Sequence, residues 1–96
     1  MNRVLLTAQI LERKALRYTP AGLPALDLVL KHESEVVEAQ LTRKVQLEVK
    51  AVAIGPIAQA LSRQAIGEAI KVAGFLGATR SGRGVLLHIT ELNESF

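Results

Sequence analysis

The chain has 96 residues, a length that suits one domain and is short for two. Twelve Lys and Arg against nine Asp and Glu give a net charge of +3, and the lack of cysteine excludes a disulfide framework, thiolate metal ligands and a cysteine nucleophile. The only aromatic residues are Tyr18, Phe75 and Phe96, so the core must be built from Leu, Val, Ile and Ala. We expect a single small domain over residues 1–96, of modest stability or dimeric.

The amino-terminal segment does not resemble a signal peptide or a membrane span. Thr7, Gln9 and Glu12 interrupt its apolar run, and no stretch of the chain approaches the roughly 18 apolar residues of a membrane helix. We therefore expect a cytoplasmic protein that has no membrane partner.

The first half of the chain predicts three strands. Residues 4–11 and 25–31 alternate apolar and polar side chains, and residues 41–53 show the cleanest alternation in the sequence. Between the first two strands, residues 12–24 contain two prolines and a glycine, which predict a loop. The acidic residues 32–40 are interpreted as a solvated loop.

The second half predicts one helix and two strands. Pro56 suits a first helical position, and residues 57–66 carry apolar side chains at helical spacing. Residues 69–78 and 85–92 return to strand character, with a hairpin at residues 79–84. This element order is that of an all-β, five-stranded OB-fold barrel with one short helix between the third and fourth strands.

Basic residues gather in the loop after the first strand, at the start of the third strand and in the last hairpin. With one tyrosine, they form the candidate set for binding nucleic acid: Arg13, Lys14, Arg17, Tyr18, Arg43, Lys44, Arg80 and Arg83. Guanidinium groups pair with phosphates, and a base stacked on an aromatic ring contributes about 1–3 kcal/mol. Each cluster alone also fits ordinary surface charge, so the interpretation depends on the clusters converging on one side of the barrel.

The sequence contains no recognisable catalytic constellation. His32 and His88 lack companions at metal-ligand spacing, and the glycines around Arg80 precede a strand without the Gly-Lys-Ser/Thr of a phosphate-binding loop. We expect no enzyme activity, no metal and no cofactor.

Four segments resemble the primosomal replication protein N (PriB) family: NRVLLTAQI, TPAGLP leading into LDLVLKHES, VAGFLG and VLLHITEL. The resemblance implies a homodimer of OB-folds paired through first-strand edges, which binds single-stranded DNA and assists the PriA helicase in replication restart. Its basic binding positions match Arg17, Arg43, Arg80 and Arg83.

The sequence also departs from this family. Gln46 stands where some relatives carry an aromatic residue, Glu33 stands where some carry a basic one, and the hairpin at residues 79–84 is shorter, with fewer lysines. Fewer contacts predict weak binding with a flatter salt dependence.

The alternative is a dimeric primosome adaptor with little DNA affinity of its own. An RNA-binding cold-shock barrel is disfavoured, because the middle strands lack aromatic residues.

Overall fold

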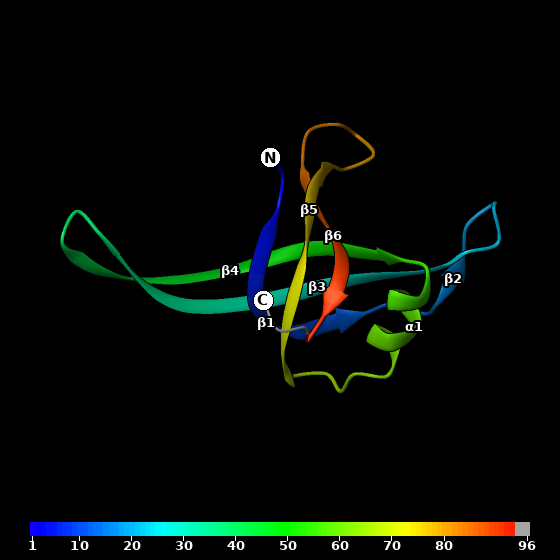
Figure 1. The fold of residues 1–96 in the computed structure, drawn as a ribbon, viewed down its shortest axis with the longest axis horizontal. Helices are drawn as coiled ribbons and strands as arrows, with labels where there is room; N and C mark the ends of the chain where they lie inside the picture. Colours follow the sequence, from blue (N-terminus) through cyan, green and yellow to red (C-terminus); the bar gives the residue numbers. More distant parts are fainter. Residues whose placement is uncertain (94–96) are drawn as a thin grey trace.

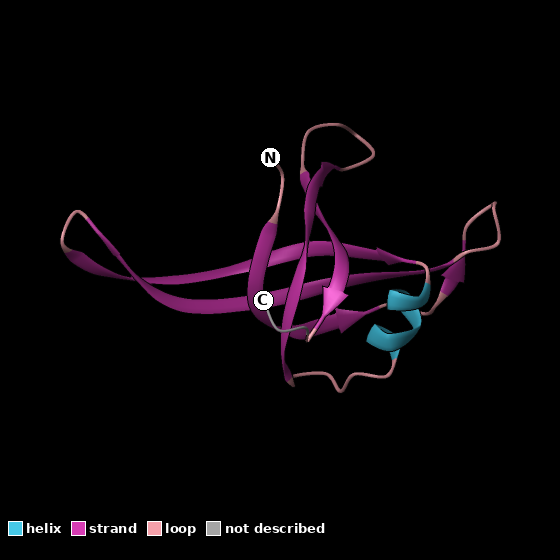
Figure 2. Ribbon diagram, viewed as in Figure 1, coloured by secondary structure: helices cyan, strands magenta, loops and turns pink. Residues whose placement is uncertain are grey.

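The computed structural model describes residues 1–93 as a small β-barrel from which three hairpin loops project in different directions (Figure 1). The elements follow in the order β1 (Val4–Arg13), β2 (Arg17–Tyr18), β3 (Pro24–Glu38), β4 (Leu41–Ile54), α1 (Pro56–Ser62), β5 (Ala69–Ala78) and β6 (Val85–Leu92). The short helix lies between β4 and β5 (Figure 2). The predicted OB-fold element order is confirmed, with the two-residue β2 as an addition.

Strand β1 closes the barrel because it pairs with two partners in turn. Its first part, from Val4 to Gln9, is antiparallel to β5, and its second part, from Gln9 to Arg13, is antiparallel to β3. The register with β3 shifts between Ile10 and Glu12, a bulge that bends the strand from one partner to the other. The sheet order β1-β5-β6-β4-β3-β2 therefore returns on itself through the β1–β3 pairing.

The core consists of aliphatic side chains, as predicted. The largest fully buried residues are Ile10, Leu26, Leu30, Leu61, Ile70, Val72, Leu87 and Ile89. Helix α1 contributes Ala58 and Leu61 and so covers one end of the barrel. At Gly74, a Cβ would lie 1.7 Å from the carbonyl oxygen of His88, so only glycine permits this approach of β5 to β6.

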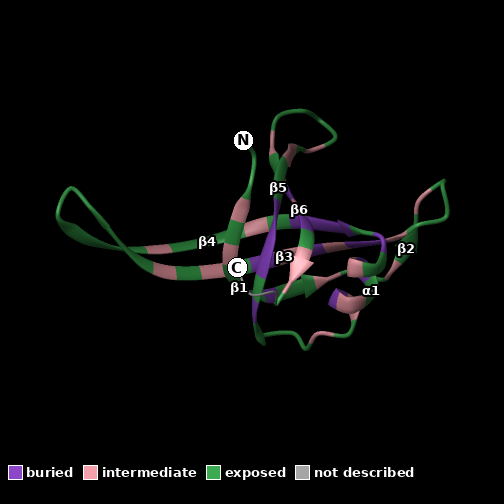
Figure 3. Ribbon diagram, viewed as in Figure 1, coloured by how far each residue is buried: buried purple, intermediate pink, exposed green. Residues whose placement is uncertain are grey.

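The acidic residues 32–40 were wrongly predicted to form a loop. Strand β3 continues to Glu38, and β4 begins at Leu41, so the two strands form a long ribbon that extends beyond the barrel (Figure 2). The turn consists of Ala39 and Gln40, with φ of 50° and 66°. Two consecutive positive φ values suit a two-residue hairpin, but this pair lacks the Asn-Gly signal that would reveal one. The far part of the ribbon is exposed (Figure 3).

Two other predicted boundaries also differ. The helix ends at Ser62 rather than near residue 66, and β2 occupies part of the predicted loop by pairing Arg17 with Ala25 and Tyr18 with Pro24. Within residues 1–93, no helix is both long and apolar enough to cross a membrane.

Arg13, predicted in a loop, is the last residue of β1 and lies against the end of α1. Its guanidinium donates hydrogen bonds to the carbonyl of Leu61, at 3.2 Å, and to that of Gln64. The carbonyl of Leu61 also accepts from the amide of Gln64 at 3.2 Å, so Arg13 adds a charged donor to the carbonyls at and just after the end of the helix. This contact joins α1 to the barrel wall.

We predict that Arg13→Ala lowers the free energy of unfolding by about 1–3 kcal/mol, because partly buried carbonyls lose a charged donor. Urea denaturation followed by circular dichroism measures this. Lys14→Ala is the matched control, since Lys14 is exposed and has no ion pair within residues 1–93; its cost should stay below about 0.5 kcal/mol. Equal stability of the two variants would contradict the assignment.

Candidate nucleic-acid interface

The loop after β1 and strand β2 place Arg17 and Tyr18 at one end of the barrel. Arg17 donates from Nε to Oδ2 of Asp27 at 2.8 Å and from a terminal nitrogen to Oδ1 at 3.2 Å, a two-pronged ion pair. The hydrogen bond from Arg17 holds the pKa of Asp27 below its ordinary value, and the carboxylate raises the pKa of Arg17. Tyr18 is 63% exposed. Asp27 thus neutralises one of the predicted DNA contacts.

The hairpin between β5 and β6 presents Arg80 and Arg83 on a tip that is tied together internally. The amide of Thr79 donates to the carbonyl of Gly84 at 3.1 Å, and the amide of Gly82 donates to the carbonyl of Thr79 at 2.8 Å. Both arginines are exposed. Beneath them lies an open groove of about 850 Å³. Its walls combine the basic Lys50, Arg80 and Arg83 with the apolar Val49, Leu76 and Val85, and they also include one carboxylate, Glu48.

Lys50 links this groove to the loop after β1. It lines the groove below the hairpin and also a second hollow, of about 310 Å³. The lining of this hollow includes Lys14 and Leu86 together with the carboxylates Glu12 and Asp27. Lys14 and the hairpin arginines are therefore parts of one surface that crosses β3, β4 and β6. Lys50 was not among the predicted site residues, although its position on the polar face of its strand was visible in the alternation of residues 41–53.

The third predicted cluster, Arg43 and Lys44, lies apart from the other two. Both residues are on the projecting ribbon, well away from the β5–β6 hairpin (Figure 1). Arg43 is paired with Glu38 at 2.7 Å, and Lys44 lies opposite Glu35 in the β3–β4 register. The structure thus brings together two of the three basic clusters, through Lys50, and leaves the third among carboxylates.

His32 has a local structural role. Its Nδ1–H donates to the carbonyl of Thr7 at 2.6 Å, and the hydroxyl of Ser34 donates to its Nε2 at 2.8 Å, so both ring nitrogens are occupied. Within residues 1–93, no group of three or more His, Cys, Asp or Glu side chains is placed to hold a metal ion.

Comparison with known families identifies relatives over almost the whole chain. Residues 2–91 match the model of a family described as "another single-strand binding protein family". Replication restart protein PriB of Bordetella pertussis is 48% identical over 92 residues, which cover 95% of this chain and 86% of that protein. The PriB of Neisseria gonorrhoeae is 40% identical over 95 residues, which cover 97% of this chain and 93% of that protein.

Solved structures show the same fold. PriB from Ralstonia solanacearum has a TM-score of 0.87 at 36% identity, and the alignment covers 96% of this chain and 95% of that one. The single-stranded DNA binding protein from Thermus aquaticus has a TM-score of 0.73 at 26% identity, with 96% of this chain and 48% of that chain covered.

The Arg17–Asp27 pair predicts an acid-sensitive part of the stability. Because the folded pKa of Asp27 is lowered, its contribution is complete above the unfolded pKa near 3.8 and is lost as the pH falls through the folded value. At pH 7 we expect the free energy of unfolding of the wild type to be about 0.5–1 kcal/mol higher than that of Asp27→Asn, a small difference because both groups are exposed. This difference should disappear near pH 2. Urea titrations at both pH values measure it. Arg17→Gln should lower the free energy of unfolding at pH 7 by the same amount. A difference between wild type and Asp27→Asn that does not change with pH would contradict the prediction.

Proposed function

Because the chain belongs to the replication restart protein PriB family, we propose that it binds single-stranded DNA weakly, without strong sequence preference, and assists the PriA helicase in replication restart. The observation that carries this proposal is the surface that joins Lys14, through Lys50, to Arg80 and Arg83 across two hollows that share Lys50. The linings of these hollows also include three carboxylates, Glu12, Asp27 and Glu48. The four basic side chains have no ion pair within residues 1–93, so their charge is available to phosphates. The proposed activity is binding without catalysis.

The weakness of binding follows from the carboxylates near the other predicted contacts. Arg17 and Arg43 each hold a carboxylate, and Glu33 lies opposite Gln46 on the ribbon, where an aromatic residue is absent. A phosphate that binds either arginine must displace the carboxylate paired with it, which reduces the favourable free energy of binding. Tyr18, exposed beside Arg17, supports stacking of a single base at this end.

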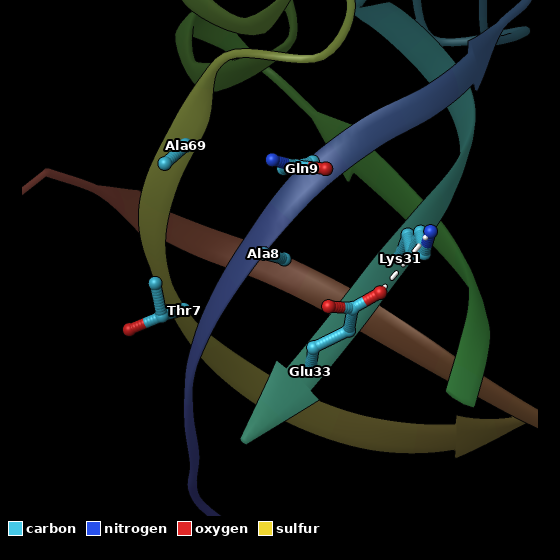
Figure 4. A pocket seen from close by; sticks show the side chains of 6 residues that line it. All are labelled: Thr7, Ala8, Gln9, Lys31, Glu33 and Ala69. Carbon is cyan, nitrogen blue, oxygen red and sulfur yellow. Dashed lines mark ion pairs between the residues drawn. The ribbon is translucent and has the colours of Figure 1, made fainter. Parts of the chain in front are cut away.

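We further propose that two copies pair through β1. The first part of β1 pairs with β5 along one edge, and its other edge is not covered by any described strand. On β1, the carbonyl of Thr7 accepts a hydrogen bond from the ring of His32. Beside this edge, a hollow of about 230 Å³ opens where β1 leaves β5 for β3, and the ion pair of Lys31 with Glu33 lies on its β3 side (Figure 4). An open strand edge of this kind is a template for pairing with another strand.

The basic surface predicts that replacing both Arg80 and Arg83 with Ala weakens binding to a labelled oligo-dT. Each lost phosphate contact should lower the slope of log affinity against log salt by about 0.7. Fluorescence anisotropy at several salt concentrations measures both effects. Arg63→Ala, an exposed arginine beyond α1, is the matched control. If the double variant binds oligo-dT as well as the wild type does, the binding site lies elsewhere. If the wild type binds PriA but no oligonucleotide, even at low salt, the function is that of an adaptor.

The dimer is tested by sedimentation equilibrium of the full chain. We expect a dimer at micromolar concentration and a shift toward monomer for Leu5→Lys, because Leu5 lies in the open part of β1 and is 52% exposed. Val85→Lys is the matched control, since Val85 is 60% exposed and pairs with Ala78, outside the part of β5 that pairs with β1. A wild-type monomer, or equal masses for Leu5→Lys and wild type, would contradict pairing through this edge.

A further inference from the structure

The outer face of β5 and β6 carries an aromatic pair that the proposed function has not yet used. Phe75 and His88 lie opposite each other in the β5–β6 register, with ring centroids 4.6 Å apart and ring planes 10° from parallel. Phe75 is 40% exposed, and His88 is half-buried. Such a stacked, accessible pair is unusual in a chain with so few aromatic residues, and it leaves ring surface open to a ligand.

Gly77 allows the imidazole to take this position. A Cβ at Gly77 would lie 2.9 Å from Nε2 of His88 and 3.1 Å from its Cδ2, closer than a side chain tolerates. The backbone of Gly77 does not itself require glycine, because its φ is outside the left-handed region. The glycine therefore matters for the ring above it, and the position of His88 beside Phe75 is built into the sheet.

The pair lies on the same face as the basic surface. In the strand registers, Asp27 is opposite Val52, Val52 is opposite His88, and His88 is opposite Phe75. Directly paired residues project to the same side of a sheet, so this row runs from the Arg17–Asp27 ion pair to the two rings.

The neighbouring row joins the rings to the cationic groups. Leu86 is two residues from His88 on β6 and therefore shares its face. Leu86 also lines the hollow that contains Lys14 and Lys50. A single strand held by these lysines would thus pass beside the pair, within reach of an accessible ring.

We propose that the Phe75–His88 pair is the stacking platform for one base of a bound single strand, with His88 fixing the ring of Phe75. The proposal rests on the proposed function, because the lysines and the hairpin arginines hold the phosphates. Such a platform compensates for the lack of an aromatic residue at position 46 of β4, where this chain has Gln46. Because every base has a π face, such a platform adds affinity without selecting sequence, typically about 5- to 150-fold per stacked base.

The test separates base contacts from phosphate contacts. A labelled oligo-dT and an abasic oligonucleotide of the same length carry the same phosphates, but only the first has bases to stack. We expect Phe75→Leu to weaken oligo-dT binding roughly 10-fold while leaving abasic binding and the salt slope unchanged, as measured by anisotropy. The Arg80→Ala, Arg83→Ala double variant should instead weaken binding of both probes.

Further variants control for structural effects. Gly77→Ala displaces the imidazole and should reproduce part of the loss on oligo-dT, whereas Phe75→Trp keeps an aromatic face and should retain binding. Ile66→Ala removes an apolar side chain that is 54% exposed in the loop between α1 and β5, and should change neither affinity. Thermal unfolding of each variant confirms that the fold is kept.

Two results would overturn the platform: oligo-dT binding by Phe75→Leu equal to that of wild type, or an equal loss on both probes, which would mark a purely structural role. Failure of the underlying function is seen separately in the wild type. If the wild-type chain binds neither probe at low salt, the proposed function fails, and the platform fails with it.

Discussion

The division of β1 between two partners is the constraint on which the rest of the structure depends. The bulge between Ile10 and Glu12 lets one strand pair first with β5 and then with β3, which closes the sheet around an aliphatic core. Closure fixes the outer face that spans β3, β4, β6 and β5. It also leaves one edge of the first part of β1 open, so the barrel and the proposed dimer contact have the same origin.

Pairing of charges, more than their number, decides which surface is available to a ligand. The net charge of +3 is small, and several cations are already engaged: Arg13 by helix carbonyls, Arg17 by Asp27 and Arg43 by Glu38. The cations without carboxylate partners among the described residues include Lys14, Lys50 and the hairpin arginines, which line two adjoining hollows. A surface with so few free cations favours weak binding with a shallow salt dependence, to which even one stacked base would add substantially.

The projecting ribbon shows how far local patterns can mislead. Residues 32–38 carry three glutamates and no turn signal in the residues that follow, so their composition suggested a solvated loop. They form a strand because β4 supplies a partner along their whole length, up to the pair of Glu38 with Leu41. Cross-strand hydrogen bonds and opposite charges, such as Glu35 facing Lys44, then stabilise a segment whose own pattern is weak.

The sequence by itself determined the order of the strands, the single helix after Gly55, the last hairpin and the aliphatic core, because alternation, helical spacing and turn residues are local signals. Only the tertiary structure decided which charges are neutralised and which aromatic rings meet. Asp27 is ten residues from Arg17, and Phe75 is thirteen from His88, so their contacts depend on strand register. The same reason explains why Lys50 was missed as a link between clusters: its neighbours Lys14 and Arg80 are brought near it only when the barrel closes.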